Sequence, residues 1–105
     1  MTPRRVLAAA ALAASLAGCA EPATDPLTER GRQVYLGQCM VCHGPDPARD
    51  GPLGPAVKGA SPALLEAKVL RGDYPPGHTP KRPSRAMPPM PALEPDIPAL
   101  AAYLD

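Results

Sequence analysis

Two of the three cysteines and one of the two histidines in this 105-residue chain fall within five residues, in the segment Cys39–Gly44, CMVCHG. Residues three apart share a face of a helical turn, so Cys39 and Cys42 can project to the same side. His43 comes four residues after Cys39 and turns under that face. The fold must therefore present two sulfur atoms and one imidazole to a common neighbour.

Several chemistries use thiols at this spacing. In an oxidising compartment the two cysteines could form a disulfide, and a Cys-x-x-Cys dithiol could also be redox-active. Neither explains the histidine that follows directly. Zinc would want four ligands, and the chain offers the three motif residues with His78, which is a poor spacing.

Cys-x-x-Cys-His is the attachment motif of c-type haem. The two cysteines would each bond one vinyl group of the haem, and Nε2 of His43 would reach the iron as an axial ligand. We predict one haem c, bound covalently through Cys39 and Cys42, and keep the disulfide and zinc as alternatives.

A haem would also account for an unusual composition. Beyond residue 18 the chain has no Phe, no Trp and three Tyr, with sixteen Pro and eight Gly. Large aromatic rings usually dominate the burial of a small core, so something else must fill this interior. We predict an all-α fold of about three helices, with proline-rich loops, around the covalently bound haem.

Two stretches have clear helix signals at both ends. The first helix is predicted over Pro26–Gln38, where Asp25 is a suitable N-cap and proline occupies the first helical position. The second is predicted over Pro62–Arg71, with Ser61 as N-cap and Gly72 as the residue that ends it.

A third helix is predicted over Pro95–Leu104, where apolar residues repeat at helical spacing. Pro98 falls within its first turns, where a missing N–H donor can be awkward. The segment before it, residues 72–91, is rich in proline and can form neither strand ladders nor a long helix. We predict that these residues form a stiff strap across one face of the haem.

Residues 1–18 have the composition of an export signal. Arg4 and Arg5 supply positive charge, an apolar run follows from Val6 to Leu16, and small residues come next. Eleven apolar residues are too few to span a bilayer, which needs about 20. The sequence therefore predicts an exported protein rather than a transmembrane anchor.

The end of this signal, Leu16-Ala17-Gly18-Cys19, resembles the lipobox of bacterial lipoproteins. The resemblance implies cleavage before Cys19 and attachment of lipid to it, and several acyl chains give durable anchoring. An ordinary signal peptide is the alternative. Residues 19–25 would then be a short tether. The predicted location is the periplasmic or cell-surface face of a bacterial membrane.

The charge balance limits the partners. Residues 19–105 carry nine Lys and Arg and ten Asp and Glu, a net charge of about −1 with neutral histidines, which does not support nucleic-acid binding. The sequence pairs no nucleophile with a base and offers no second metal set. We predict an electron-transfer protein rather than an enzyme, with no small-molecule substrate.

Several separated segments, in order, resemble the small class I bacterial c-type cytochromes over about residues 26–105. GRQVYLGQCMVCHG, residues 31–44, is similar to the first helix and haem motif of that family. GPLGPAVKG, residues 51–59, resembles the loop after the motif, and MPPMPALEPDIPALAAYL, residues 87–104, resembles the axial methionine loop and last helix. The resemblance implies a small cytochrome c fold for residues 26–105.

The same resemblance implies particular contacts. In this family a proline carbonyl commonly accepts a hydrogen bond from the proximal histidine, which implies that Pro55 orients His43. The first and last helices pack crosswise, with a small residue against an aromatic one. Gly31, Tyr35 and Tyr103 fit that contact.

The second axial ligand must come from a segment that folds over the opposite haem face. Met87 and Met90 both qualify, and His78 and Lys81 are remoter candidates. The family's methionine is followed by proline and leaves room for the chain to turn into the last helix. Met87 fits both points better, so we predict Met87, with Met90 as the alternative. Thioether ligation raises the potential relative to a second imidazole and suits electron transfer.

Five basic side chains lie in or near the strap: Lys68, Arg71, Lys81, Arg82 and Arg85. They could steer an acidic redox partner towards the haem edge. Alternatively, one or two of them could neutralise the haem propionates together with Tyr74. Both roles stay open, and Tyr74 is counted among the predicted haem-binding residues.

Together these inferences predict a monohaem cytochrome that carries one electron between donor and acceptor proteins while a lipid tethers it to a membrane. Two alternatives stay open. The chain could be the haem subunit of a periplasmic dehydrogenase or oxidase complex, or a haem sensor or gas-binding protein whose sixth ligand is displaceable.

Overall fold

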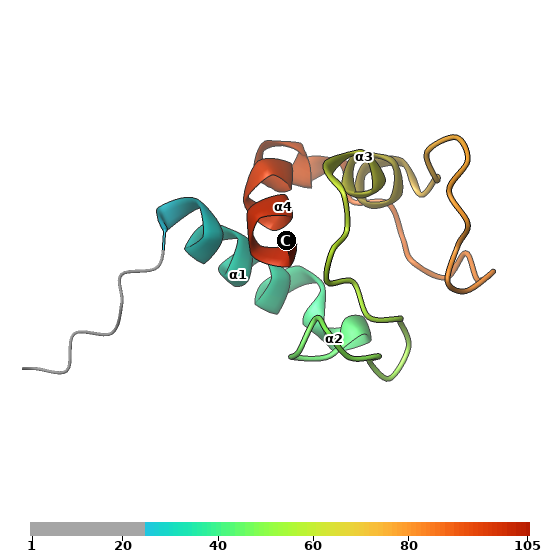
Figure 1. The fold of residues 1–105 in the computed structure, drawn as a ribbon, viewed down its shortest axis with the longest axis horizontal. Coiled ribbons are helices and arrows are strands. Elements are labelled where there is room, and N and C mark those ends of the chain that lie inside the picture. Colours follow the sequence, from blue (N-terminus) through green and yellow to red (C-terminus); the bar gives the residue numbers. More distant parts are fainter. Residues whose placement is uncertain (1–24) are drawn as a thin grey trace, which may run out of the picture.

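A computed structural model describes residues 25–105 of the chain. The predicted signal, Cys19 and nearly all of the predicted tether lie outside these residues. The described part contains helices and loops without any strand, and its elements are α1 (Pro26–Gln38), α2 (Met40–His43), α3 (Pro62–Leu65), the π-helical turn η1 (Glu66–Leu70), the 3₁₀ helix η2 (Pro91–Asp96) and α4 (Ile97–Leu104). The predicted all-α class is confirmed (Figure 1).

The first helix has the predicted bounds. The side chain of Asp25 accepts a hydrogen bond from the backbone N–H of Thr28 at 3.2 Å, as an N-cap does. At the other end, the N–H of Cys39 donates to the carbonyl of Tyr35 at 2.8 Å. α1 therefore leads directly into the cysteine motif.

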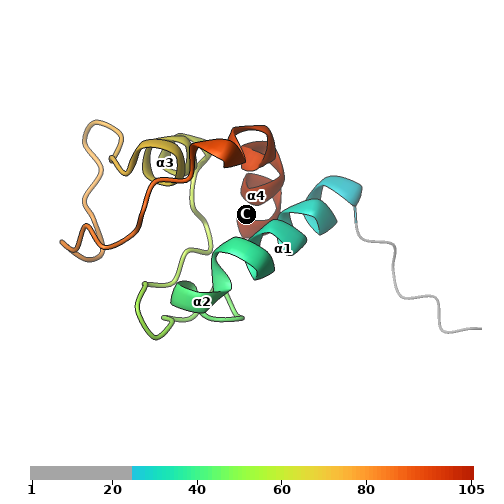
Figure 2. The same cartoon turned by 180° about the vertical axis from the view of Figure 1, so that it is seen from behind.

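α1 and α4 cross each other, as both ribbon views show (Figures 1 and 2). Gly31 lies at the crossing, where an added Cβ would collide with the backbone carbonyl of Ala99. Nearby, the rings of Tyr35 and Tyr103 pack with their centroids 5.5 Å apart and tilted by 50°. The predicted crosswise contact between the first and last helices is confirmed.

The second predicted helix forms over nearly the expected residues but is not a uniform α-helix. α3 starts with Ser61, whose hydroxyl accepts from the N–H of Leu64 at 3.1 Å. After one turn the chain continues as η1, and Gly72 ends the segment with φ of +71°. The helical segment predicted over residues 62–71 is confirmed, and within it residues 66–70 form a wider π turn, a feature that often occurs at functional sites.

The last helix begins later than predicted. η2 occupies residues 91–96 and α4 starts at Ile97 rather than at Pro95. Pro98 is consequently in the first turn of α4, where the backbone N–H has no partner within the helix. The concern that this proline would weaken the helix does not apply at that position.

The core lies where α1, α3, η1 and α4 meet. Its buried apolar residues form one cluster: Val34, Tyr35, Leu65, Val69, Ile97, Leu100 and Leu104. The strap, residues 72–91, extends beyond α3 on the side away from α4 (Figures 1 and 2). Among the described residues, no helix combines the length and apolar character needed to cross a bilayer.

Two glycines of α1 provide a matched test of this packing. Gly31→Ala should lower the free energy of unfolding by about 1–3 kcal/mol, because its methyl group would press on the backbone of α4. Gly37 is exposed in the same helix and has no atom within 4 Å of an added Cβ. Gly37→Ala should therefore be neutral or stabilising by up to about 1 kcal/mol.

Denaturant unfolding of the purified protein measures both changes. Equal effects of the two substitutions would contradict a close crossing at Gly31.

Candidate functional site

The cysteine motif occupies one short helical turn. The N–H of His43 donates to the carbonyl of Cys39 at 3.0 Å, and the N–H of Gly44 donates to the carbonyl of Met40 at 2.8 Å. Gly44 has φ of +81°, which turns the chain away after the histidine. The backbone therefore places both cysteines and His43 within one turn of α2.

Tyr35 fixes this turn to α1. Its side chain is fully buried, and its hydroxyl donates to the carbonyl of Gly44 at 2.7 Å. Burial raises the pKa of the Tyr35 hydroxyl, so it stays protonated and able to donate. The tyrosine predicted only for helix packing also positions the end of the motif.

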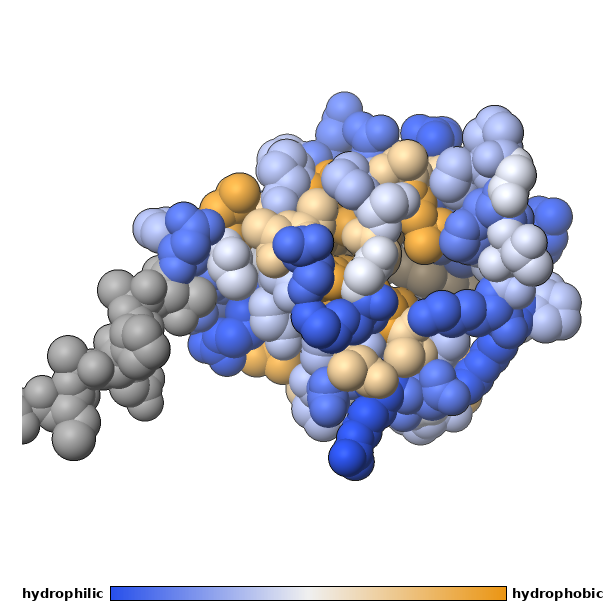
Figure 3. Space-filling view, viewed as in Figure 1, coloured by the Kyte–Doolittle hydropathy of each residue, from blue (hydrophilic) through white to orange (hydrophobic). Residues whose placement is uncertain are grey.

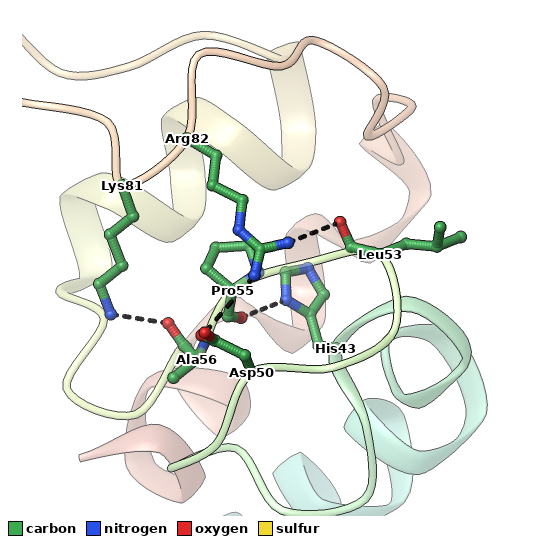
Figure 4. A network of polar contacts seen from close by, with 7 residues as sticks. All are labelled: His43, Asp50, Leu53, Pro55, Ala56, Lys81 and Arg82. Carbon is green, nitrogen blue, oxygen red and sulfur yellow. Dashed lines mark hydrogen bonds and ion pairs between the residues drawn. The ribbon is translucent and has the colours of Figure 1, made fainter.

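The His43 ring is held by the loop that follows the motif. Nδ1 lies 2.8 Å from the carbonyl oxygen of Pro55 (Figure 4). Because a carbonyl can only accept, Nδ1 carries the proton and Nε2 is left with a lone pair. The contact anticipated between His43 and Pro55 is thus present, and it selects the tautomer that a metal ligand needs.

Gly54 packs directly against the histidine ring. A Cβ at this position would lie 2.6 Å from Nδ1 and Cε1 of His43, so no larger residue fits. The N–H groups of Leu53 and Gly54 both donate to the carbonyl of Cys42, at 3.1 and 2.8 Å. The loop is therefore hydrogen-bonded to the motif, and it holds the His43 ring by close packing as well as by a hydrogen bond.

The two cysteines differ in environment and are not joined by a disulfide. Cys42 is exposed, whereas Cys39 is half-buried and lines a cavity. Burial raises the pKa of the Cys39 thiol to about 11, while catalytic dithiols have a lowered thiol pKa. This environment disfavours a thioredoxin-type redox pair.

The zinc alternative also lacks support. Within residues 25–105 no three His, Cys, Asp or Glu side chains are grouped so that they could hold a metal ion. His78, the fourth candidate ligand, is exposed and stacks on Tyr74 with the ring centroids 5.3 Å apart.

A cavity of about 350 Å³ lies beside Cys39 and His43, within the size range of small-molecule sites, about 300–1,000 Å³. α1, α2, the 53–60 loop, α3, η1, the strap and α4 all contribute to its wall. Figure 3 shows apolar residues around a hollow in this face, with hydrophilic residues at its border. Five predicted site residues line the cavity, and they are Cys39, His43, Pro55, Tyr74 and Met87. Cys42 and Met90 are not part of its lining.

One polar group in this lining belongs to Lys68, which in the sequence was one of five equivalent basic candidates. The Nζ of Lys68 is buried and has no hydrogen-bond partner among the described residues, and it lies 4.5 Å from the centroid of the Tyr74 ring. A buried ammonium without an acceptor is costly. The sequence does hold a signal for the burial of this group. Lys68 follows Leu64 and Leu65 at helical spacing, so it lies on the face of the helix that packs in the core.

These features suit a haem. The cavity offers an apolar wall for a flat ring, a thiol and an imidazole at one side, and a buried cation for a carboxylate. The side chains of Cys39, His43 and Lys68 thus match the chemistry of that group at three separate points.

Comparison with known proteins gives an independent result. The family model described as Cytochrome c matches residues 28–105, from the first turn of α1 to the last residue. No curated protein and no solved structure matches the chain.

Proposed function

We propose that this chain, which belongs to the cytochrome c family and is therefore a haem-binding electron carrier, holds one haem c between His43 and Met87. When bound, the haem supplies a reversible Fe(II)/Fe(III) couple. The observation that carries the proposal is that both of these side chains line the same cavity together with Cys39.

The first axial ligand would be His43. Its Nδ1 is engaged by Pro55, so Nε2 is the free nitrogen, and the close packing of Gly54 limits rotation of the ring. Cys39 and Cys42 would bond the haem covalently from the same turn. A hydrogen bond from Nδ1 to a carbonyl also increases the donor strength of the imidazole.

Met87 is the better candidate for the second ligand. It lines the cavity, whereas Met90 does not, and the N–H of Met90 is bound to the carbonyl of Val69 at 2.6 Å. His78 is stacked on Tyr74, and the Nζ of Lys81 donates to the carbonyl of Ala56 at 2.7 Å. His78 and Lys81 also line the cavity but have these other partners, and Met90 lies outside the lining.

Lys68 and Tyr74 would bind an acidic group of the haem. The buried ammonium of Lys68 would supply the positive charge that a haem carboxylate needs. The same ammonium lies over the face of the Tyr74 ring, which stabilises it through a cation–π interaction. Tyr74 was predicted for this role, while Lys68 was one of five basic candidates.

The donor and acceptor would be redox proteins that meet an exposed apolar edge. Val41 and Leu53 are 76% and 72% exposed, and they flank the exposed Cys42 in the motif and in the loop bound to it. A contiguous exposed apolar patch marks a contact site, and we propose that these two side chains form such a patch beside Cys42. The same edge would serve a permanent complex, so a haem subunit of a dehydrogenase or oxidase stays the second candidate function.

The predicted set of basic residues is only partly available to a partner. The Nζ of Lys68 is buried, and Lys81 and Arg82 donate to backbone carbonyls. Arg71 and Arg85 border a second groove, which Tyr74, Glu66 and Asp73 also line. We propose that these two arginines provide most of the attraction for an acidic partner.

Replacing each methionine tests the axial ligand. Met87→Ala should abolish the weak near-infrared band expected of methionine ligation in the ferric protein and let the ferrous protein bind carbon monoxide readily, because one axial position becomes open. Met90→Ala should retain the band, since its side chain lies outside the cavity. Identical spectra of the two variants and the parent protein would contradict the assignment.

Salt dependence tests the basic surface. The rate of oxidation of the reduced protein by hexacyanoferrate, an anion, should fall as ionic strength rises from about 0.01 to 1 M, where the Debye length shrinks from about 30 to 3 Å. Arg85→Gln should flatten this profile. A profile that is flat in the parent protein would count against attraction by this surface.

Membrane attachment rests on the sequence of the export signal, with lipid on Cys19. Expression with the full signal, followed by separation of membranes, should place the parent protein in the membrane fraction. Cys19→Ser should release a pigmented protein to the soluble fraction, because the acyl chains can no longer be attached. Equal distribution of the two proteins would refute the lipid anchor.

A further inference from the structure

The strap that carries Met87 is joined to the rest of the described chain by few hydrogen bonds. At its ends, the N–H of Asp73 donates to Ala67 at 3.0 Å and the N–H of Met90 donates to Val69 at 2.6 Å. Between these ends, the hydrogen bonds from the strap to other described segments come from the side chains of Lys81 and Arg82.

Both side chains reach the loop that holds His43, as Figure 4 shows. The Nζ of Lys81 donates to the carbonyl of Ala56 at 2.7 Å, and Arg82 donates to the carbonyl of Leu53 at 3.2 Å. Arg82 also lies 3.5 Å from a carboxylate oxygen of Asp50.

The acceptors are close together in the chain. Leu53, Pro55 and Ala56 offer their carbonyl oxygens to Arg82, His43 and Lys81 respectively. Asp50 links the set further, because its other carboxylate oxygen accepts from the N–H of Ala56 at 2.8 Å. One four-residue loop, residues 53–56, therefore contacts both the histidine and the segment that carries Met87.

We propose that Lys81 and Arg82 are positioning residues that hold the strap, and with it Met87, over the cavity by binding the 53–56 loop. The inference rests on the proposed ligation by Met87. It adds that Lys81 and Arg82 determine how firmly Met87 ligates the iron, because their hydrogen bonds to backbone carbonyls hold the strap in place.

The strap is stiff, and a stiff segment needs few hydrogen bonds to stay in place over the cavity. Pro80 and Pro83 flank the basic pair and restrict its backbone, so ordering the strap costs less entropy than in a flexible loop. Hydrogen bonds from charged donors are stronger than neutral ones. Two such bonds near the middle of the strap can therefore shift its opening equilibrium substantially.

Carbon monoxide binding to the ferrous holoprotein tests the effect on the ligand. The double variant Lys81→Gln with Arg82→Gln should bind carbon monoxide at least about tenfold more tightly than the parent, because the loss of either of its two charged hydrogen bonds alone would give an effect of about that size. Arg49→Gln is the matched control, because it removes an exposed positive charge that binds neither the strap nor the 53–56 loop, its ion pair being with Asp46 at 3.7 Å. It should leave the affinity unchanged.

Limited trypsin digestion of the same holoproteins tests opening without reference to the iron. The strap bond after Arg85 is present in the parent and in the double variant, so the rate of that one cleavage can be compared directly. Release of the strap should increase it about tenfold in the double variant. Lys81→Arg, which keeps a long charged donor, should cleave close to the parent rate.

The outcomes separate the two proposals. Faster cleavage together with tighter carbon monoxide binding supports the role of Lys81 and Arg82. Unchanged cleavage, or faster cleavage without a change in carbon monoxide affinity, overturns it. If Met87→Ala itself leaves carbon monoxide binding as in the parent, the ligation by Met87 is wrong, and the positioning role falls with it whatever the cleavage shows.

Discussion

The hydrogen bond between Nδ1 of His43 and the carbonyl of Pro55 is the interaction on which the site depends. It fixes the tautomer, leaves the lone pair on Nε2, and accompanies the close packing of Gly54 against the ring. The loop can supply it because its own N–H groups are bound to Cys42 and because the motif is tied to α1 through Tyr35. The crossing of α1 and α4 thus supports the histidine through a short series of contacts.

Most of the fold could be predicted because its signals are local. Asp25 and Ser61 cap helices at the expected positions, and Gly72 ends the second helical segment with a positive φ. A cap depends on residues within one turn, so a sequence reports it well. The cysteine motif is local in the same sense. The crossing at Gly31 was predicted from the resemblance to a family. The structure gives the physical reason, because the carbonyl of Ala99 approaches Gly31 too closely for a Cβ.

The rest depends on contacts between distant residues. The π turn at residues 66–70 has no recognised local signal in the sequence. The last helix starts at Ile97 and not at the predicted Pro95, because residues 91–96 form the 3₁₀ helix η2. The basic residues near the strap looked alike in sequence. Lys68 and Lys81 both line the cavity, but the buried Nζ of Lys68 has no hydrogen-bond partner among the described residues, whereas Lys81 bonds to a loop 25 residues away in the chain. Only the packed structure distinguishes a cation left without an acceptor from one that binds the backbone.

The central claim is that Cys39 and Cys42 bond a haem above His43. The most direct measurement is the intact mass of the protein, exported from cells able to mature c-type haem and treated with a thiol-alkylating reagent under denaturing conditions. We expect the mass of the processed, lipid-bearing chain from Cys19 onwards plus one haem, with both motif cysteines protected from alkylation. A colourless product with Cys39 and Cys42 free to react, or joined to each other in a disulfide, would contradict the account.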